Sequence, residues 1–370
     1  MVWIHGFHLM LLPSFLRRSL TTARIGYYFH TPFPSSELWR TMTRREDLLR
    51  GILAADQIGF HLYEYARHFL TTCQRLLGYG HEMTPGGVLA VNVDGREVAV
   101  TCIHVGIDLL RIEGVLSHSS FDHKVAVWRK RFPDKIVVSG IDRLERLKGI
   151  PLKLLAIDEF MAENPRWRGK LLFSIIGVTA PERGIDYLQT LRDVTIMVAR
   201  LNEKYSTGPG DQVVFFQEKK DVPLDERLAF FGASDMLMIT APRDGLNRLP
   251  MEFTLAKQRT GGSAGPGGGM IVVSEFISSA RVMRGAITVN PWRVDEVKHA
   301  LVVALETPVA ERADRFRRNM EFSTRVSTAK WAMHVLHDLK VRESASARKA
   351  IVFSIYISAH SPHLIYNSLA

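Results

Sequence analysis

The sequence has little cysteine and no long hydrophobic stretch. Cys73 and Cys102 are the only cysteines in 370 residues. Because two cysteines cannot build a disulfide framework or a thiolate metal site, we expect a reducing, cytoplasmic compartment. No apolar run reaches the ~20 residues that a membrane-spanning helix needs. The apolar start, residues 1–18, lacks the basic stretch that opens a secretory signal peptide, so we expect neither export nor membrane insertion.

Long runs of one charge are also missing, although the chain is basic overall. Lysine and arginine number 48 and aspartate and glutamate 38, which gives a formal net charge of +10. A net positive charge favours an anionic partner such as a nucleic acid, a membrane or a phosphorylated metabolite. The basic residues are scattered, and no RNA-recognition, zinc-finger or helix-turn-helix signature is present. We therefore expect a phosphorylated small molecule as the partner, and no nucleic acid.

Strand-like and helix-like segments alternate through the first 134 residues. Strands are expected at residues 2–5, 25–29 and 55–61, and helices at 7–17, 45–53 and 63–77. Asp94-Gly95 is a strong two-residue turn signal, so residues 88–93 and 96–103 are expected to form a hairpin.

The alternation restarts at residue 135. Strands are expected at residues 136–139, 171–178, 212–217, 236–240, 270–273 and 287–289. Strands that alternate with helices predict an α/β fold with parallel, doubly wound sheets. We therefore expect two Rossmann-like domains facing a cleft. Their expected limits are 1–134 and 135–325, followed by a helix at 326–340 that packs back on the first domain and an irregular tail at 341–370.

A short charged segment, residues 142–149, lies where a predicted strand ends and a predicted helix begins. It reads DRLERLKG and carries Arg143 and Lys148 at its tip. Loops at the carboxyl ends of parallel strands are where α/β proteins bind ligands. Two cations beside the positive end of a helix suit a diphosphate. The alternative is a solvated loop whose cations pair with Glu145 or Asp142.

A second candidate is residues 243–247, which read RDGLN and precede Pro250, a residue suited to the first turn of a helix. Gly245 would let backbone amides approach a sugar or phosphate closely. Asp244 can accept hydrogen bonds from sugar hydroxyls, and Glu252, in the first helical turn, can hold both hydroxyls of a ribose. The alternative is an ordinary helix start whose acidic residues complement the helix dipole.

Four segments occur in an order that resembles the trehalose-6-phosphate synthase family, retaining glycosyltransferases of GT-B architecture. They are residues 2–10 (VWIHGFHLM), 30–37 (HTPFPSSE), 142–149 (DRLERLKG), and 243–247 (RDGLN) with Glu252. Each is weak alone, but the ordered set is specific. The resemblance implies two Rossmann-like domains.

The resemblance also implies a reaction. Glucose would pass from UDP-glucose to glucose 6-phosphate with retention at the anomeric carbon, as a step of trehalose biosynthesis. UDP-glucose is the expected donor substrate, with no cofactor and no metal. No pair of close carboxylates is needed, unlike in retaining glycosidases. The expected partners are these two small molecules and further copies or subunits in a homo- or hetero-oligomer.

The resemblance assigns roles to particular residues. The expected catalytic residues are His30, Arg143, Lys148 and Asp244. The expected donor-binding residues are Arg143, Lys148, Asp244, Gly245, Leu246, Asn247 and Glu252. His30 is expected to contact the donor glucose, the alternative being a core histidine bonded to backbone. Arg183 is expected to help hold the acceptor's 6-phosphate, the alternative being a solvated loop arginine.

The sequence departs from the family pattern in three ways. Residues 5–8 read His-Gly-Phe-His where the family has His-Asp-Tyr-His, and Gly6 cannot make the aspartate's bond to the acceptor sugar. Such a loss costs ~1–3 kcal/mol. The family has further sequence before this motif, so we expect an incomplete first domain with an open strand edge and weak stability. Arg248 and Leu249 replace the usual Leu-Val. The alternative function is therefore a catalytically inactive homologue, acting as a nucleotide-sugar-binding regulatory subunit of a trehalose synthase complex.

Overall fold

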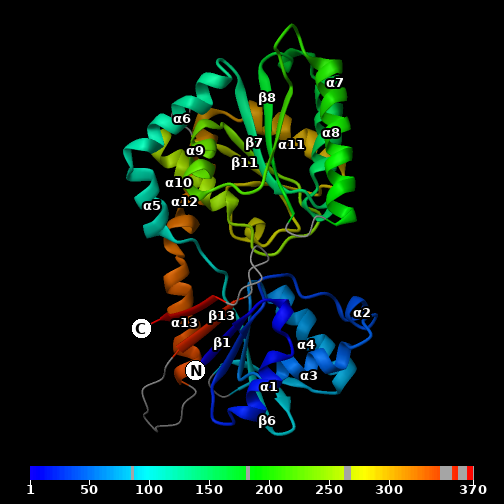
Figure 1. Cartoon of the computed structure of the whole chain (residues 1–370), viewed down its shortest axis with the longest axis vertical. Coiled ribbons are helices and arrows are strands. Elements are labelled where there is room, and N and C mark those ends of the chain that lie inside the picture. The colour runs from blue at the N-terminus through cyan, green and yellow to red at the C-terminus, as the bar shows by residue number, and fades with distance from the viewer. Residues whose placement is uncertain (85–86, 181–183, 262–267, 342–351, 357–364, 370) are drawn as a thin grey trace. The chain divides into compact units, whose positions relative to one another are not determined.

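The chain forms two units in the computed structural model, each built around one β-sheet (Figure 1). The structure describes residues 1–84, 87–180, 184–261, 268–341, 352–356 and 365–369. The first unit comprises Met1–Val105 with Thr328–Ala370, and the second comprises Gly106–Ser327. Within the described ranges, no helix is both long and apolar enough to cross a membrane.

The sheet of the first unit has the strand order β14-β13-β1-β2-β3-β6-β5-β4. Strands β13, β1, β2, β3 and β6 run parallel, and β14, β5 and β4 are antiparallel to their neighbours. The strands are β1 (Val2–His5), β2 (Ile25–Tyr28), β3 (Gln57–Phe60), β4 (His81–Met83), β5 (Leu89–Val93), β6 (Arg96–Cys102), β13 (Val352–Tyr356) and β14 (Ile365–Leu369). The helices are η1 (Phe7–Leu9), α1 (Leu12–Ser19), α2 (Ser36–Trp39), α3 (Arg45–Leu53), α4 (Tyr63–Leu77) and α13 (Thr328–Val341).

Side-chain alternation explains how this first sheet is covered. Every residue of β1, β2 and β3 is buried, as is typical of strands with both faces covered. Ile4 and Tyr27 point into a core shared with α3 and α4. Trp3 and Tyr28 point to the other face, where their rings lie 4.8 and 5.0 Å from the ring of Trp331 on α13.

The sheet of the second unit is parallel throughout, with the order β12-β11-β10-β7-β8-β9. Its strands are β7 (Ile136–Arg143), β8 (Leu171–Val178), β9 (Val214–Lys219), β10 (Met236–Ile239), β11 (Met270–Ser274) and β12 (Ile287–Val289). Its helices are α5 (Leu109–Ser117), α6 (Ser119–Arg131), η2 (Arg146–Lys148), α7 (Ile150–Glu163), η3 (Pro165–Trp167), α8 (Ile185–Tyr205), α9 (Leu224–Ala233), α10 (Leu249–Thr260), η4 (Ser278–Arg281), α11 (Val294–Glu306) and α12 (Val309–Arg325).

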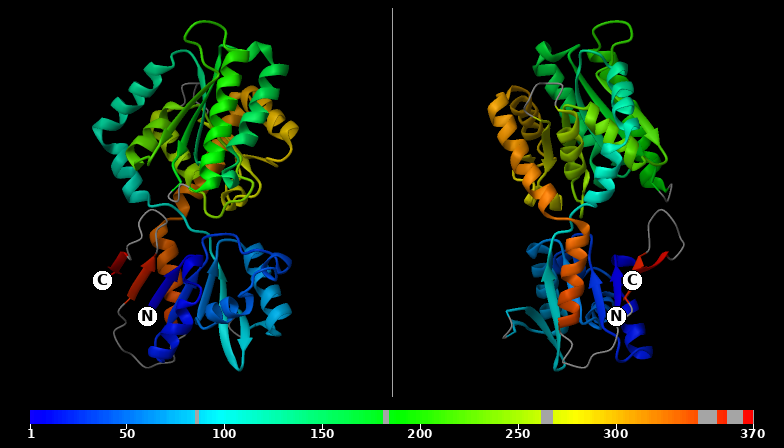
Figure 2. Two further views of the ribbon diagram at one scale, coloured as in Figure 1. Left: turned by 45° about the vertical axis from the view of Figure 1, so that its right-hand side comes forward. Right: turned by 90° about the vertical axis from the view of Figure 1, so that its left-hand side faces the viewer.

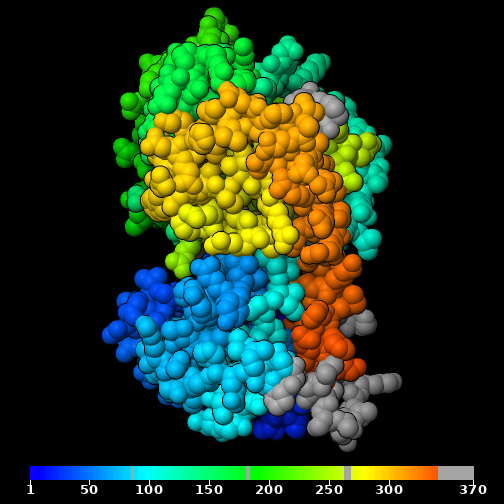
Figure 3. Space-filling view, turned by 180° about the vertical axis from the view of Figure 1, so that it is seen from behind, coloured from blue at the N-terminus to red at the C-terminus, as the bar shows by residue number. Residues whose placement is uncertain are grey.

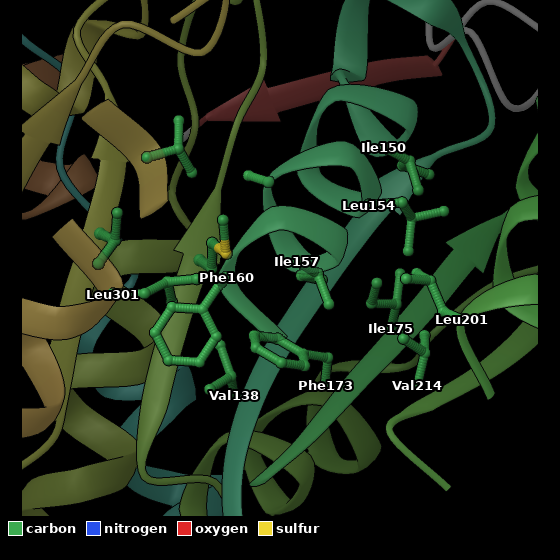
Figure 4. Close-up of a cluster of buried hydrophobic side chains, with 14 of the residues drawn as sticks. Val138, Ile150, Leu154, Ile157, Phe160, Phe173, Ile175, Leu201, Val214 and Leu301 are labelled. Atoms are coloured by element: carbon green, nitrogen blue, oxygen red, sulfur yellow. The ribbon is translucent and has the colours of Figure 1, made fainter. Parts of the chain in front are cut away.

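Helices cover both faces of the second sheet (Figures 1 and 2). One core lies under α7, α8 and α11, where Leu154 and Phe160 of α7 and Phe173 of β8 belong to one buried cluster (Figure 4). The other core lies under α5, α6, α9 and α10. Seen from behind, the segment from α10 to α12 forms the yellow and orange surface of this unit (Figure 3). The unit is therefore a three-layer α/β/α sandwich.

The predicted boundary between residues 134 and 135 is wrong, because the second unit already begins at Gly106. Helices α5 and α6 bury Ile112, Phe121 and Val125 in the core beside α9. An alternating strand–helix pattern shows that a helix packs on a sheet but not which sheet it covers. The chain leaves this unit after Ser327, which pairs with Ile107 in an isolated parallel bridge.

The prediction of an irregular tail after residue 340 is wrong for residues 352–356 and 365–369, which form strands. Strand β13 pairs in parallel with β1, and β14 pairs antiparallel with β13. The edge of β1 that we expected to be open is therefore occupied. An unpaired strand edge presents a row of free hydrogen-bond donors and acceptors with which another strand can pair. Residues 352–356 can form that strand, because their β-branched and aromatic side chains have high strand propensity.

Two consecutive leucines on α7 test the packing of the second unit. Leu154 is 0% exposed and Leu155 is 45% exposed. We expect Leu154→Ala to lower the free energy of unfolding by about 2–5 kcal/mol, because it leaves a cavity in a close-packed core. Leu155→Ala, the matched control, should change it by about 0.5 kcal/mol or less. Urea unfolding followed by circular dichroism measures both, and equal losses would contradict this packing.

Candidate functional site

Gly149 brings the two predicted loops of the second unit together. It adopts a left-handed conformation with φ 69° between η2 and α7. A Cβ at this position would collide with the carbonyl oxygen of Thr240, just after β10. The Thr240 hydroxyl donates to the Gly149 carbonyl at 2.9 Å. Because β7 and β10 are neighbouring parallel strands, the loops at their carboxyl ends meet at one edge of the sheet.

Lys148 and Asp244 meet at this edge. Their Nζ and Oδ1 atoms lie 3.0 Å apart, and both side chains are largely buried. Asp244 also accepts hydrogen bonds from the Gly245 amide at 2.9 Å and the Asn247 side chain at 3.2 Å. The Asn247 side-chain oxygen in turn accepts from the Leu249 amide at the start of α10, at 3.1 Å. An ammonium has three N–H donors and this pair uses one, so the lysine can still bind a phosphate oxygen.

Arg143 ends strand β7 and is about one-third exposed. Its guanidinium lies 3.4 Å from the Glu145 carboxylate, the pairing that the sequence left open as an alternative. A guanidinium has five donors, so this contact is compatible with a second anionic partner. Asp142 is different, because its carboxylate pairs at 2.6 Å with Lys153 of α7 and both side chains are 2% exposed. That buried pair ties the end of β7 to the helix that follows it.

Glu252 lies in the first turn of α10 and is buried. Arg227 of α9 holds its carboxylate with two hydrogen bonds, Nε to Oε2 at 2.5 Å and Nη2 to Oε1 at 3.1 Å. Both residues line a cavity of about 540 Å³ in the second unit, together with Arg248 and residues of 107–115 and 221–225. The sequence did not single out Arg227, because it lies in a charged helix start that reads as a solvated surface.

Leu246 follows Gly245 in the same loop, and the Gly245 carbonyl accepts from the Ser278 amide at 3.2 Å and the Ser278 hydroxyl at 2.8 Å. The second unit therefore places the predicted donor-binding residues at or just after the ends of β7 and β10, except Glu252, which lies in the first turn of α10. Arg183 lies outside the described residues. Within those residues, no group of three or more His, Cys, Asp or Glu side chains is arranged to hold a metal ion.

His30 belongs to the first unit, where it follows β2. Its Nε2 lies 3.0 Å from Nδ1 of His5, and its Nδ1 lies 3.3 Å from Nε2 of His61. His61 continues the chain through Nδ1, which lies 3.3 Å from the Tyr28 hydroxyl. These contacts join His30 to the side chains of His5 and His61.

The imidazoles of His5, His61 and His104 are kept neutral by burial. Burial, and to a lesser extent His30, lowers the pKa of His5 to about 3. Burial also lowers the pKa of His61 well below its usual 6.5, and lowers that of nearby His104 to about 4. A neutral imidazole has one donor and one acceptor nitrogen. His5 and His61 therefore each present either a donor or an acceptor nitrogen to His30.

Gly6 differs from the family pattern in its backbone as well as its side chain. It has φ 82° and ψ 157°, a combination that is essentially restricted to glycine. Its carbonyl accepts a 2.5 Å hydrogen bond from the Tyr27 hydroxyl. An aspartate in this place would require a different main-chain path.

The buried pair of Asp142 and Lys153 yields a stability test. We expect Lys153→Met to lower the free energy of unfolding by about 3–5 kcal/mol, since it leaves a buried carboxylate without its cation. Lys153→Met combined with Asp142→Leu should recover most of this loss. Urea unfolding of both variants makes the comparison, and a double variant no more stable than the single one would refute the pairing.

The neutral histidines predict that acid destabilises the first unit. Because their pKa values are lower in the folded than in the unfolded protein, the unfolded state binds more protons between about pH 4 and 6.5. The free energy of unfolding should therefore fall as the pH drops through this window, by up to about 1.4 kcal/mol per pH unit for each histidine.

Hydrogen exchange of first-unit peptides at several pH values between 5 and 7.5, corrected for intrinsic exchange rates, measures this slope. His104→Gln should reduce this slope by the contribution of one histidine. A first unit whose stability is constant over this range would show that the cluster is not kept neutral.

Comparisons with known proteins agree with the predicted family resemblance. The sequence model of Glycosyltransferase family 20 matches residues 1–341. A probable UDP-forming alpha,alpha-trehalose-phosphate synthase of Arabidopsis thaliana is 37% identical over 343 residues. The match includes 92% of this chain and 40% of the plant protein, so the chain spans less than half the length of that relative.

Solved structures show the same fold. The N-terminal domain of Candida albicans trehalose-6-phosphate phosphatase superimposes with a TM-score of 0.83 at 29% identity, over 93% of this chain and 70% of that one. A UDP-forming trehalose-phosphate synthase of Burkholderia xenovorans in complex with glucose-6-phosphate gives a TM-score of 0.83 at 22% identity, over 91% and 73%. The predicted α/β fold with two Rossmann-like domains of the GT-B type is confirmed. On its motifs, its fold and its match to the family model, the chain belongs to Glycosyltransferase family 20.

Proposed function

We propose that this chain binds UDP-glucose through its second unit and transfers the glucose to glucose 6-phosphate, forming UDP. The observation that carries the proposal is the meeting of Lys148 and Asp244 at the ends of β7 and β10, with Arg143 at the end of the same strand β7. This edge of a parallel sheet is a usual ligand site. The names of the plant and Burkholderia relatives, both UDP-forming synthases, support the same substrates.

Each residue has a distinct task in this reaction. Arg143 and Lys148 would stabilise the negative charge that develops on the departing diphosphate, because fixed cations act most strongly where charge appears in the transition state. Asp244 would accept from the glucose hydroxyls while Lys148 turns toward the phosphate. Glu252 would hold the ribose. UDP-glucose is the donor substrate, and the step requires no cofactor.

His30 and Arg183 complete the proposed set. His30 would contact the donor glucose, for which it must release one of its two bridges to His5 and His61. Arg183 would hold the acceptor's 6-phosphate.

A second candidate function is nucleotide-sugar binding without transfer, as a regulatory subunit of a trehalose synthase complex. The glycine backbone at Gly6 favours it, because the family's acceptor-binding aspartate does not fit this main chain. The likeness to the N-terminal domain of a Candida phosphatase supports it as well, since that protein is named for a different reaction.

Binding and turnover together distinguish the two candidates. Titration calorimetry with UDP-glucose and a UDP-release assay with glucose 6-phosphate should show binding and release above background if the chain is an enzyme. Binding without release would select the regulatory role. A chain that binds neither UDP nor UDP-glucose would overturn both.

Lys148→Met tests whether the diphosphate of UDP binds beside Lys148. We expect it to weaken UDP binding about tenfold to about a hundredfold, the effect of one hydrogen bond to a charged group. Lys204→Met is the matched control, because Lys204 also forms an ion pair with an aspartate, Asp158 at 2.8 Å on α7. The control should leave UDP affinity within about twofold. Equal effects of the two changes would place the diphosphate elsewhere.

A further inference from the structure

Arg227 offers an inference about nucleotide selectivity, which rests on the proposed function. We propose that Arg227 is a positioning residue that orients the Glu252 carboxylate for a ribose diol, and so makes the chain selective for ribonucleotides over 2′-deoxyribonucleotides. The two residues come from different helices, α9 and α10, and both line the 540 Å³ cavity.

The guanidinium of Arg227 is held at three points. Nε and Nη2 donate to the two oxygens of Glu252, and Nη1 donates to the carbonyl oxygen of Val222 at 2.9 Å. A planar fork bound in this way fixes both the position and the plane of the carboxylate. Through Val222 it also fixes the loop before α9, which lines the same cavity.

The carboxylate keeps acceptor capacity in this arrangement. An ionised carboxylate has about four lone-pair sites on two oxygens, and Arg227 occupies one site on each oxygen. One further site on each oxygen can accept from the 2′ and 3′ hydroxyls of a ribose. A nucleotide without the 2′ hydroxyl would leave one of these sites unfilled in a buried position.

Because Glu252 is buried, the orientation of its carboxylate decides which ligand groups it can bind. The Glu252 side chain is 5% exposed, against 20% for Arg227. A carboxylate removed from water in this way depends on the groups that touch it. Removing the guanidinium would delete two of its hydrogen bonds at once and free it to turn. The proposed diphosphate contacts, Arg143 and Lys148, come from the end of β7 and from η2, so Arg227 is distinct from them.

The experiment compares UDP with 2′-deoxy-UDP. Titration calorimetry on the full chain gives the ratio of the two dissociation constants for wild type, Arg227→Met, Arg227→Lys and Glu252→Gln. Arg259→Met is the matched control, because Arg259 lies on α10 and forms an exposed ion pair with Asp122 at 2.7 Å. Circular dichroism verifies that each variant is folded.

We expect wild type and Arg259→Met to prefer UDP about tenfold or more, the effect of one hydrogen bond to a charged group. Arg227→Met and Glu252→Gln should bring the ratio close to one. Arg227→Lys should give an intermediate ratio, since a lysine keeps the charge without the fork. This ratio is insensitive to a general loss of affinity, which affects both nucleotides alike.

The outcomes separate this inference from the proposed function. If wild type binds no UDP, the proposed function fails and the role of Arg227 fails with it. If UDP binds and Arg227→Met keeps the wild-type ratio, only the role of Arg227 is overturned, and Arg227 is then a structural tie between α9 and α10. If Arg227→Met does not fold, the ratio in Arg227→Lys decides, and a ratio equal to that of wild type overturns the inference.

Discussion

The absence of a side chain at Gly149 is the constraint on which the candidate site depends. Only glycine allows the chain to turn into α7 with φ 69° while its backbone lies against the Thr240 carbonyl. This contact holds the segments that follow β7 and β10 against each other. Lys148, one residue before the glycine, can then reach Asp244, four residues after the threonine. Two loops nearly a hundred residues apart in the sequence thereby become one site.

The charges of this site are already paired within the second unit. The pairs are Lys148 with Asp244, Arg143 with Glu145, and Glu252 with Arg227. A diphosphate would therefore exchange or extend partners and would not meet bare charges. Exchange limits the desolvation cost, because no charge is left without a counter-charge, and it also limits the affinity gained from any one contact. Under the proposed function, a ligand that carries both a diphosphate and a diol would engage all three pairs, so the arrangement would favour binding selectivity over binding affinity.

Much of the local structure could be predicted from the sequence. Helices α3 and α4 have the predicted limits, and the hairpin turn at Asp94-Gly95 joins β5 to β6, with both residues at positive φ as the turn requires. These features depend on residues close together in the chain. The donor-binding set could be found for a different reason, since its motifs are short and contiguous.

Features that depend on distant contacts were not predictable in the same way. The pairing of β13 with β1 joins residues about 350 positions apart, and no local pattern specifies that register. The packing of α5 and α6 against α9 moved the boundary between the units. Arg227 was missed because its role exists only through Glu252, which lies on another helix. The two histidine partners of His30 could not be predicted either, because His5 and His61 lie far from it in the sequence.

Gly6 and His30 place the strictest limits on the chemistry of the first unit. At Gly6 the main chain itself excludes an aspartate, so the missing acceptor contact is not the loss of a side chain alone. His30 can reach a sugar hydroxyl only by giving up its bond to His5 or His61, both of which are buried. Leaving such a group without that bond costs about 1–3 kcal/mol. Binding of the UDP part by the second unit carries neither cost, contact of His30 with the donor glucose carries the second, and transfer carries both. Binding of UDP is therefore the less demanding half of the proposed function, and transfer requires the first unit to meet both costs.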